Sequence, residues 1–277
     1  MRLILLTLLT MCAFAANSLL TRVAVEGGHI DPAGFAVLRV ASGAAMLGSI
    51  ALWRGLSLPL WGRSRAFGAI SLTVYMAGFS LAYLTLDAGL GALILFGVTQ
   101  ITMFSHAALT HEPPTARQLS GAVVAFAGLA LVLWPGEGSV TDPKGAALMC
   151  LAGLGWAAYT IAGRGAADPL AATGANFILA LPLVMLLLFF QGGIETDARG
   201  ALLAVVSGAV TSGLGYALWY VVLRQMRGTT AAVVQLAVPV IAIAAGAALL
   251  GEAVSGLVLW AAILVVGGIG WAVTAKR

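Results

Sequence analysis

Long apolar stretches alternate with short polar breaks along the whole chain. The stretches run for about 18–23 residues, the length that an α-helix needs to cross the hydrocarbon core of a bilayer. Glycine, proline and charged residues mark the breaks, as at Asp31-Pro32, Asp142-Pro143 and Asp168-Pro169. The pattern predicts an all-α membrane protein with ten transmembrane helices, at residues 3–22, 33–53, 66–86, 89–109, 117–134, 145–163, 170–190, 200–221, 229–250 and 254–274.

The composition indicates that the lipid bilayer is the partner of these apolar helices. Hydrophobic residues make up 61% of the 277 residues and charged residues 9%, with a mean hydropathy of +1.04. Soluble domains carry roughly 25% charged residues, so this chain cannot cover a surface that faces water. The net charge of +4 comes from basic residues scattered at helix ends, without the basic cluster typical of nucleic-acid binding. We therefore expect no nucleic-acid partner.

The basic residues also predict the topology. In the ten-helix layout, ten of the 14 lysines and arginines fall on the side that holds both termini. Three fall on the opposite side, and Arg39 lies within a helix. By the positive-inside rule, both termini are expected in the cytoplasm, in a multi-pass protein of a bacterial-type inner membrane.

The chain aligns with itself in two registers. An offset of 140 places Glu112 on Glu252 and Gly128 on Gly268. An offset of 142 gives the pairs Phe14–Trp156, Asn17–Tyr159 and Arg22–Arg164. Five helices per copy is an odd number, so the second copy enters the membrane upside down. We predict two inverted five-helix repeats, at 1–136 and 143–277.

The N-terminus and the two cysteines have competing interpretations. Residues 3–16 resemble a secretory signal, with a small-residue cleavage site near Ala13 and Ala15. The apolar run continues to Val25, however, and its removal would delete one partner of the repeat, so we predict a retained first helix. Cys12 and Cys150 both lie in apolar runs. We expect buried, inert thiols, no disulfide, no metal site and no cofactor.

Several segments together resemble the drug/metabolite transporter superfamily, in its ten-span EamA-type branch. They are FAANSLLTR, DPAGFAVLR and LTHE in the first half, and GLGWAAYTIAGR and QLAVPVIAIAAGAALLGE in the second. The resemblance covers almost the whole chain and implies a basket of inverted repeats that exports or exchanges small metabolites. One departure is Thr99, which stands opposite Pro239 where the family pattern commonly has proline.

Polar and aromatic side chains within the helices are candidates for contact with such a substrate. Tyr75 and Phe79 share a face of the third helix with Tyr83, as do Tyr216 and Trp219 of the eighth with Tyr220. These rings predict an aromatic-walled cavity, to which the Trp156 segment of the repeat also contributes. The alternative is packing or an interfacial aromatic belt, which is favoured for Tyr83 and Tyr220 near the helix ends.

Uncharged polar side chains deep in the helices form a second group of candidates. Its members are Asn17, Gln100, Tyr159, Asn176 and Gln235. Amides can donate and accept hydrogen bonds together, which suits a zwitterionic ligand. Hydrogen bonding between helices would explain them equally well.

Charged and titratable residues allow two interpretations each. Arg39 lies deep in the second helix and either binds a substrate carboxylate or serves the structure, by snorkelling or by binding backbone carbonyls. His106 is a candidate for proton coupling, with packing near a helix end as the alternative. Glu112 and Glu252 are expected to cap the fifth and tenth helices.

Taken together, the sequence predicts a secondary transporter of small metabolites, most of all amino acids, that works by alternating access. It is not expected to be an enzyme. An intramembrane serine protease would need a histidine after its serine, but His29, His106 and His111 precede Ser207 and Ser212. No P-loop pattern indicates ATP-driven transport. A channel remains open as an alternative, and the oligomeric state is not predicted.

Overall fold

The computed structural model describes residues 1–110, 115–133, 141–163, 165–191, 193–225 and 234–273. The first half holds five helices: α1 (Arg2–Val25), α2 (Pro32–Trp53), α3 (Arg63–Ala82), α4 (Ala88–Thr110) and α5 (Ala116–Leu133). The second half holds α6 (Pro143–Gly163), α7 (Pro169–Met185), α8 (Leu188–Gln191), α9 (Ala198–Val206), η1 (Ser207–Leu214), α10 (Gly215–Leu223), α12 (Ala237–Ala245), η2 (Gly246–Leu250) and α13 (Gly256–Val273).

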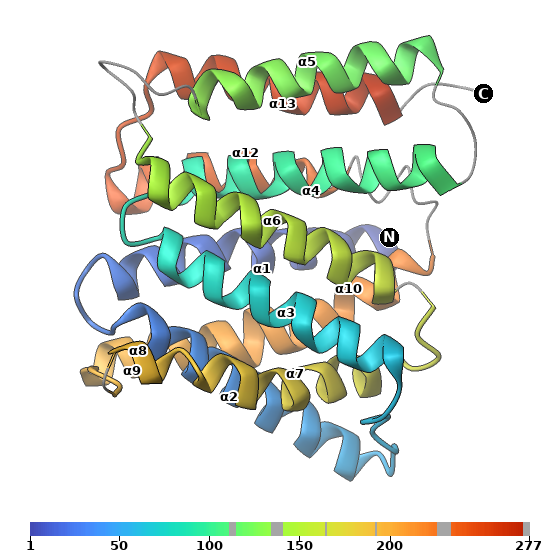
Figure 1. The fold of residues 1–277 in the computed structure, drawn as a ribbon, viewed down its shortest axis with the longest axis vertical. Helices are drawn as coiled ribbons and strands as arrows, with labels where there is room; N and C mark the ends of the chain where they lie inside the picture. Colours follow the sequence, from blue (N-terminus) through green and yellow to red (C-terminus); the bar gives the residue numbers. More distant parts are fainter. Residues whose placement is uncertain (111–114, 134–140, 164, 192, 226–233, 274–277) are drawn as a thin grey trace.

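These helices confirm the ten predicted spans. Among the described residues, six continuous helices are long and apolar enough to cross a membrane, and four shorter apolar helices complete the bundle. The eighth span is the continuous run Ala198–Leu223, made of α9, η1 and α10. The start of α1 and the end of α13 lie on the same side of the bundle, at the right of Figure 1, as an even number of crossings requires.

The helices pack in an arrangement that repeats itself between the halves. Helix α3 packs against α6, and its counterpart, the α9–η1–α10 run, packs against α1. In the same way α4 contacts α6 while α12 contacts α1. Three counterpart pairs contact each other directly: α2 with α7, α4 with α12, and α5 with α13. In Figure 1 the α5–α13 pair forms one edge of the bundle and the α2–α7 pair the other. The two inverted repeats therefore interlock around a common axis.

The seventh and eighth spans are less regular than the sequence predicts. The stretch 170–190 is expected as one helix, but α7 ends at Met185 and the short α8 follows. Pro182 lies inside α7, where its ring removes an N–H donor and crowds the preceding turn. In the eighth span, η1 is a π-helix over Ser207–Leu214. Such π-turns hold one extra residue and often lie at functional sites.

The second helix of each half begins in the same way. Asp31 and Asp168 occupy the N-cap positions of α2 and α7, each followed by proline at the first helical position. Asp31 Oδ1 accepts from the Gly34 amide at 2.7 Å, and Asp168 Oδ1 accepts from the Ala171 amide at 2.8 Å. Asp31 has a second role, because its Oδ2 accepts from the backbone amide of Glu195 at 2.9 Å.

This difference gives a prediction on stability. Asp168→Ala should lower the free energy of unfolding by about 1 kcal/mol, the usual cost of a lost N-cap. Asp31→Ala should cost about 0.5–1.5 kcal/mol more, because it also loses the bond to Glu195. Unfolding of the two purified variants in detergent measures the difference. Equal losses would mean that the bond between the loops contributes nothing.

The capping prediction for Glu252 is wrong. Helix α13 begins at Gly256, and Ser255 Oγ accepts from the amide of Val258. Glu252 instead reaches across to the first half, where its carboxylate accepts from the backbone amides of Ala88 at 2.7 Å and Gly89 at 3.4 Å. It therefore caps α4 of the opposite repeat. Its repeat counterpart Glu112 lies outside the described residues.

Candidate functional site

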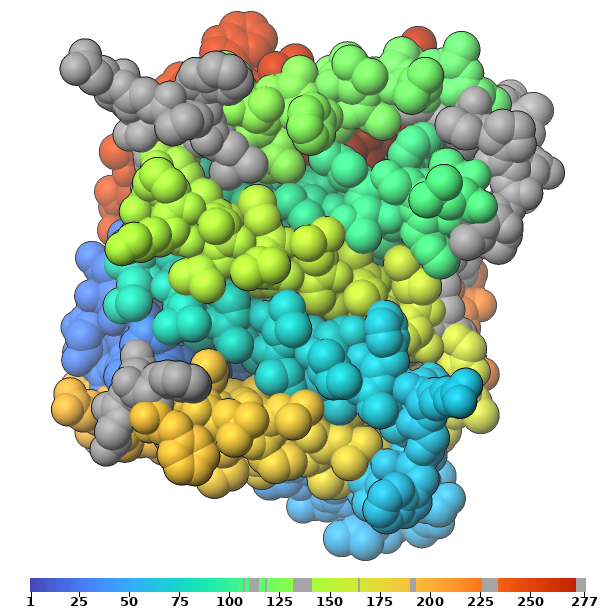
Figure 2. Space-filling model, viewed as in Figure 1, coloured from blue at the N-terminus to red at the C-terminus, as the bar shows by residue number. Residues whose placement is uncertain are grey.

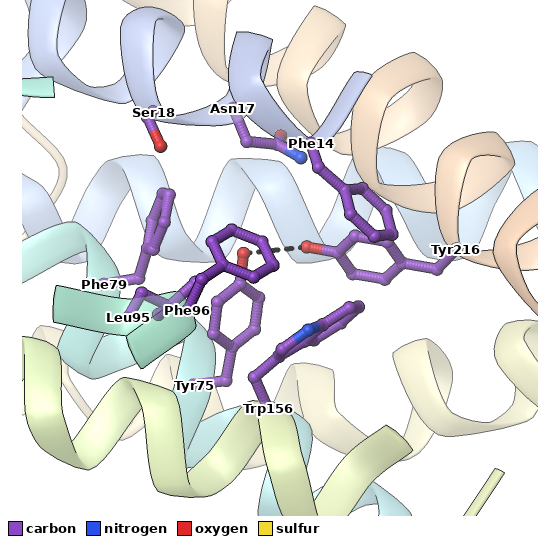
Figure 3. Close-up of a pocket in the computed structure, with 9 residues that line it drawn as sticks. All are labelled: Phe14, Asn17, Ser18, Tyr75, Phe79, Leu95, Phe96, Trp156 and Tyr216. Carbon is purple, nitrogen blue, oxygen red and sulfur yellow. Dashed lines mark hydrogen bonds between the residues drawn. The ribbon is translucent and has the colours of Figure 1, made fainter. Parts of the chain in front are cut away.

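A small cavity lies where the two halves meet. Its walls come from α1, α3, α4, α6 and α10, so both repeats contribute (Figure 3). The cavity measures about 10 Å³, which is the space for roughly one water molecule. Figure 2 shows the side chains of α3 and α6 packed closely against each other on one face of the bundle. A solute larger than water can enter only when the helices around the cavity move apart.

Most of the cavity wall is aromatic. The rings of Phe14, Tyr75, Phe79, Phe96, Trp156 and Tyr216 surround it, and Leu95, Asn17 and Ser18 complete the wall. Trp156 touches both tyrosines, with ring centroids 5.1 Å from Tyr75 and 4.7 Å from Tyr216. Such a wall suits an apolar or aromatic part of a solute.

Residues paired by the internal repeat meet at the cavity. Phe14 and Trp156, which the 142 register aligns, lie edge to face with their centroids 5.4 Å apart. Tyr75 and Tyr216 occupy related places in α3 and the eighth span, and their hydroxyls are 2.9 Å apart. Their offset is 141, one more than in the Glu112–Glu252 register. The π-helix η1 lies directly before Tyr216 in the chain, and a π-turn holds one extra residue. The cavity thus lies where related residues of the two halves meet.

Arg39 lies directly behind the two tyrosine hydroxyls. It is fully buried, and its Nη2 donates to the hydroxyls of Tyr75 at 3.0 Å and Tyr216 at 2.9 Å. Its Nε donates to Ser212 Oγ at 2.8 Å, and its Cζ lies 4.8 Å from the centre of the Phe79 ring. Burial of a charge at this depth costs several kcal/mol without a counter-charge. Within the described residues Arg39 makes no salt bridge, and its Nη1 has no hydrogen-bond partner.

Asn17 continues this polar network along η1. Its Oδ1 accepts from the hydroxyls of Ser207, Thr211 and Ser212, and its Nδ2 donates to the Thr211 carbonyl at 3.3 Å. The network therefore runs from the guanidinium of Arg39 through Ser212 to Asn17. The snorkelling alternative for Arg39 is wrong, since its side chain ends inside the bundle.

The structure brings eight of the predicted site residues together at the cavity or next to it. Five line it: Asn17, Tyr75, Phe79, Trp156 and Tyr216. A sixth, Arg39, donates hydrogen bonds to two of these five. Tyr159 stacks on Trp156 at 5.7 Å, and Trp219 lies 5.8 Å from Phe14. Both are buried just outside the cavity wall.

The remaining candidates lie elsewhere in the bundle. Gln100 and Gln235 are buried but do not line the cavity. The amide of Asn176 accepts from Arg65 Nη1 at 3.4 Å, which favours its structural interpretation. His106 is exposed near the end of α4. Its proposed role in proton coupling stays a prediction.

Two aromatic assignments need correction. Tyr83 and Tyr220 are favoured by the sequence as interfacial belt residues, yet they are 0% and 2% exposed. Tyr83 donates to the Ala88 carbonyl at 3.3 Å and Tyr220 to the Tyr159 carbonyl at 3.0 Å. They are therefore interior packing residues. A residue near a helix end is buried when a neighbouring helix covers that end. Helix α4 covers Tyr83, and α6 covers Tyr220.

Some wall residues are not among the sequence candidates. Phe14 is visible in the repeat register as the partner of Trp156 but is not assigned to the site. Ser18, Leu95 and Phe96 give no signal in the sequence, because apolar and small residues occur throughout the spans. Ser212 is considered only as a protease serine, and its role as an acceptor for Arg39 depends on the packing of α2 against η1.

The described residues contain no cluster of His, Cys, Asp or Glu side chains able to hold a metal ion. The prediction that both cysteines are buried is wrong, because Cys12 is exposed and Cys150 is partly exposed. Neither cysteine lines the cavity.

Comparisons with known proteins agree with this architecture. The model of the EamA-like transporter family matches residues 1–134 and 143–274. An uncharacterized protein of Pseudomonas aeruginosa is 46% identical over 270 residues, 97% of this chain and 93% of that protein. A protein of Salmonella typhimurium named as a probable amino-acid metabolite efflux pump is 27% identical over 218 residues, 72% and 73% of the two chains. One crystal structure superimposes with a TM-score of 0.70 at 20% identity, covering 97% of this chain and 98% of that one, and it shows the fold alone.

Proposed function

The chain belongs to the EamA-like transporter family, and from that premise we propose that it carries small organic metabolites by alternating access. Amino acids are the solutes that we favour, and the name of the Salmonella typhimurium relative supports them. We further propose export or exchange across a bacterial-type inner membrane, with both termini in the cytoplasm, as the ten-to-three distribution of basic residues predicts. The repeats are proposed to span residues 1–136 and 143–277.

One observation carries the proposal: the cavity lies between the two halves of the chain and draws its wall from both. In carriers built from inverted repeats, one repeat rocks against the other around such a central site. The cavity holds about one water molecule when closed, so a transported solute requires that motion. The residues proposed to contact it are those of the wall, above all Asn17, Tyr75, Trp156 and Tyr216, with Arg39 behind them.

Transport by purified protein in proteoliposomes tests this function. Uptake of labelled amino acids should saturate, and unlabelled solute inside the vesicles should accelerate it. Linear, unsaturated ion conductance would instead support the channel alternative and contradict the carrier.

The same assay locates the site. Trp156→Ala should lower the saturable flux by about tenfold or more, because loss of this wall removes roughly 1–2 kcal/mol of ring contacts. Trp260→Ala is the matched control, since Trp260 is 64% exposed on α13, away from the cavity. An equal effect of both variants, with equal amounts of inserted protein, would place the site elsewhere.

A further inference from the structure

Among the described residues, the charge at the centre of the bundle has no partner of opposite sign. The eight acidic residues that the structure describes lie near helix ends or between helices, and Arg39 makes no salt bridge with any of them. Its guanidinium rests on the rings of Tyr75 at 5.4 Å and Phe79 at 4.8 Å, contacts that recover only about 0.5–2 kcal/mol. A buried cation left in this state favours a ligand that brings a negative charge.

The hydrogen-bonding groups beside the cavity are predominantly donors. Arg39 Nη2 donates to both tyrosine hydroxyls, and one hydroxyl donates to the other. Each phenol has one proton, so the second phenol proton is left without an acceptor in this triad. Nη1 of Arg39 and Nε1 of Trp156 also lack hydrogen-bond partners within the described residues. Figure 3 shows the two hydroxyls pointing toward each other in the middle of the site.

The amide acceptor in the cavity wall is already saturated. The Oδ1 atom of Asn17 accepts from three hydroxyls, those of Ser207, Thr211 and Ser212. An amide oxygen has two lone pairs, so it has no capacity left for a ligand ammonium group. The site therefore has unused hydrogen-bond donors, a net positive charge and an amide acceptor without free capacity. These three properties favour the binding of an anion with several acceptor oxygens. One charge among apolar rings suits a monoanion.

We infer that the cavity recognises its solute through a carboxylate group, which binds the Tyr75 and Tyr216 hydroxyls with the positive charge of Arg39 behind them. The aromatic wall formed by Phe14, Phe96 and Trp156 then takes the apolar body of the solute. This inference rests on the proposed function and narrows its substrate class to organic carboxylates. The amino group of an amino acid is not the group that is recognised.

Three solutes of one shape separate the two charged groups. L-phenylalanine has both a carboxylate and an ammonium, 3-phenylpropanoate has only the carboxylate, and phenethylamine has only the ammonium. Ligand binding raises the unfolding temperature of purified protein in detergent. We expect a rise with 3-phenylpropanoate and L-phenylalanine at millimolar concentration and none with phenethylamine. The same order should hold for competition in proteoliposome counterflow.

Variants of Arg39 test whether this residue causes the preference for carboxylates over the amine. Arg39→Gln should abolish the difference between the carboxylates and the amine, and Arg39→Lys should retain part of it, because lysine keeps the charge but not the planar fork. If Arg39→Gln fails to fold, the comparison of the three solutes on the unchanged protein and on Arg39→Lys decides.

The outcomes distinguish this inference from the proposed function. Equal responses to all three solutes, or no thermal response to either carboxylate, would overturn the carboxylate site. Counterflow of phenethylamine alone would also overturn it, while the proposed transport function would stand. Binding of carboxylates through Arg39, without counterflow of any solute, would support the site and contradict the transport function.

Discussion

Glu252→Ala is expected to loosen the contact between the two repeats at the end of the bundle opposite the termini. The Glu252 carboxylate accepts from the amides of Ala88 and Gly89 at the start of α4, and Arg22 Nε lies 3.9 Å from it. Its side chain is only 10% exposed. Loss of a charged acceptor that serves two helix-terminal amides should cost about 2–3 kcal/mol of unfolding free energy.

Glu252→Gln is the milder variant with which Glu252→Ala is compared. Burial raises the pKa of the Glu252 carboxyl, outweighing the amides of Ala88 and Gly89, which lower it. The neutral side chain is therefore tolerated, and glutamine keeps an oxygen acceptor, so we expect less than half of the loss seen with alanine. Glu26→Gln should change stability little, because Glu26 is 53% exposed and 3.9 Å from Arg22.

The same variant should change access to the cavity. In a protein whose Cys12 and Cys150 have been replaced, Ser18→Cys places a thiol in the cavity wall. The rate at which a water-soluble reagent modifies this thiol measures access to the cavity. We expect Glu252→Ala to accelerate modification several-fold and Glu26→Gln to leave it unchanged. A lower stability with no change in the rate would mean that Glu252 stabilises the fold without closing the path to the cavity.

The helices could be predicted from the sequence because lipid imposes one length and one kind of side chain on every span. For the same reason, the apolar residues that line the cavity could not be told apart from the other apolar residues of the spans. Phe96 and Leu95 resemble many other apolar residues, and only the packing of α4 against α1 and α6 brings them to the cavity. The internal repeat was more informative, because its 142 register pairs Phe14 with Trp156, and these two rings are in contact in the structure.

Charged residues were harder to assign, because their partners lie far away in the chain. Glu252 precedes a helix in sequence and was expected to cap it, but its acceptor oxygens serve amides 164 and 163 residues away. Arg39 allowed a structural and a ligand-binding interpretation. Its bond to Ser212 depends on how closely α2 approaches η1, which no local pattern specifies. Gly208 in η1 makes that approach possible, because it has no side chain at the contact with α2.

Gly208→Ala is expected to prevent formation of the arginine site. Gly208 lies in η1 against α2, and a Cβ atom there would overlap the backbone carbonyl of Arg39 and the hydroxyl of Ser42. A backbone carbonyl cannot turn away as a side chain can, so α2 and η1 must separate. Overpacking of this kind costs typically 1–3 kcal/mol and occasionally more. The bond from Arg39 Nε to Ser212 would also be lost, which leaves more of a buried charge without partners.

The internal repeat provides the matched control. Gly68 lies 140 residues earlier (208 − 68) and faces Asn176 of α7, the counterpart of α2. There a Cβ would come within 2.8 Å of Asn176 Oδ1, but an amide at the end of a flexible side chain can rotate away. We therefore expect Gly208→Ala to lower the unfolding free energy by about 3 kcal/mol or more and Gly68→Ala by about 1 kcal/mol or less. Unfolding in detergent measures both, and the thermal response to 3-phenylpropanoate should survive only in Gly68→Ala. Equal losses in the two variants would mean that the approach of α2 to η1 is not what holds Arg39 in place.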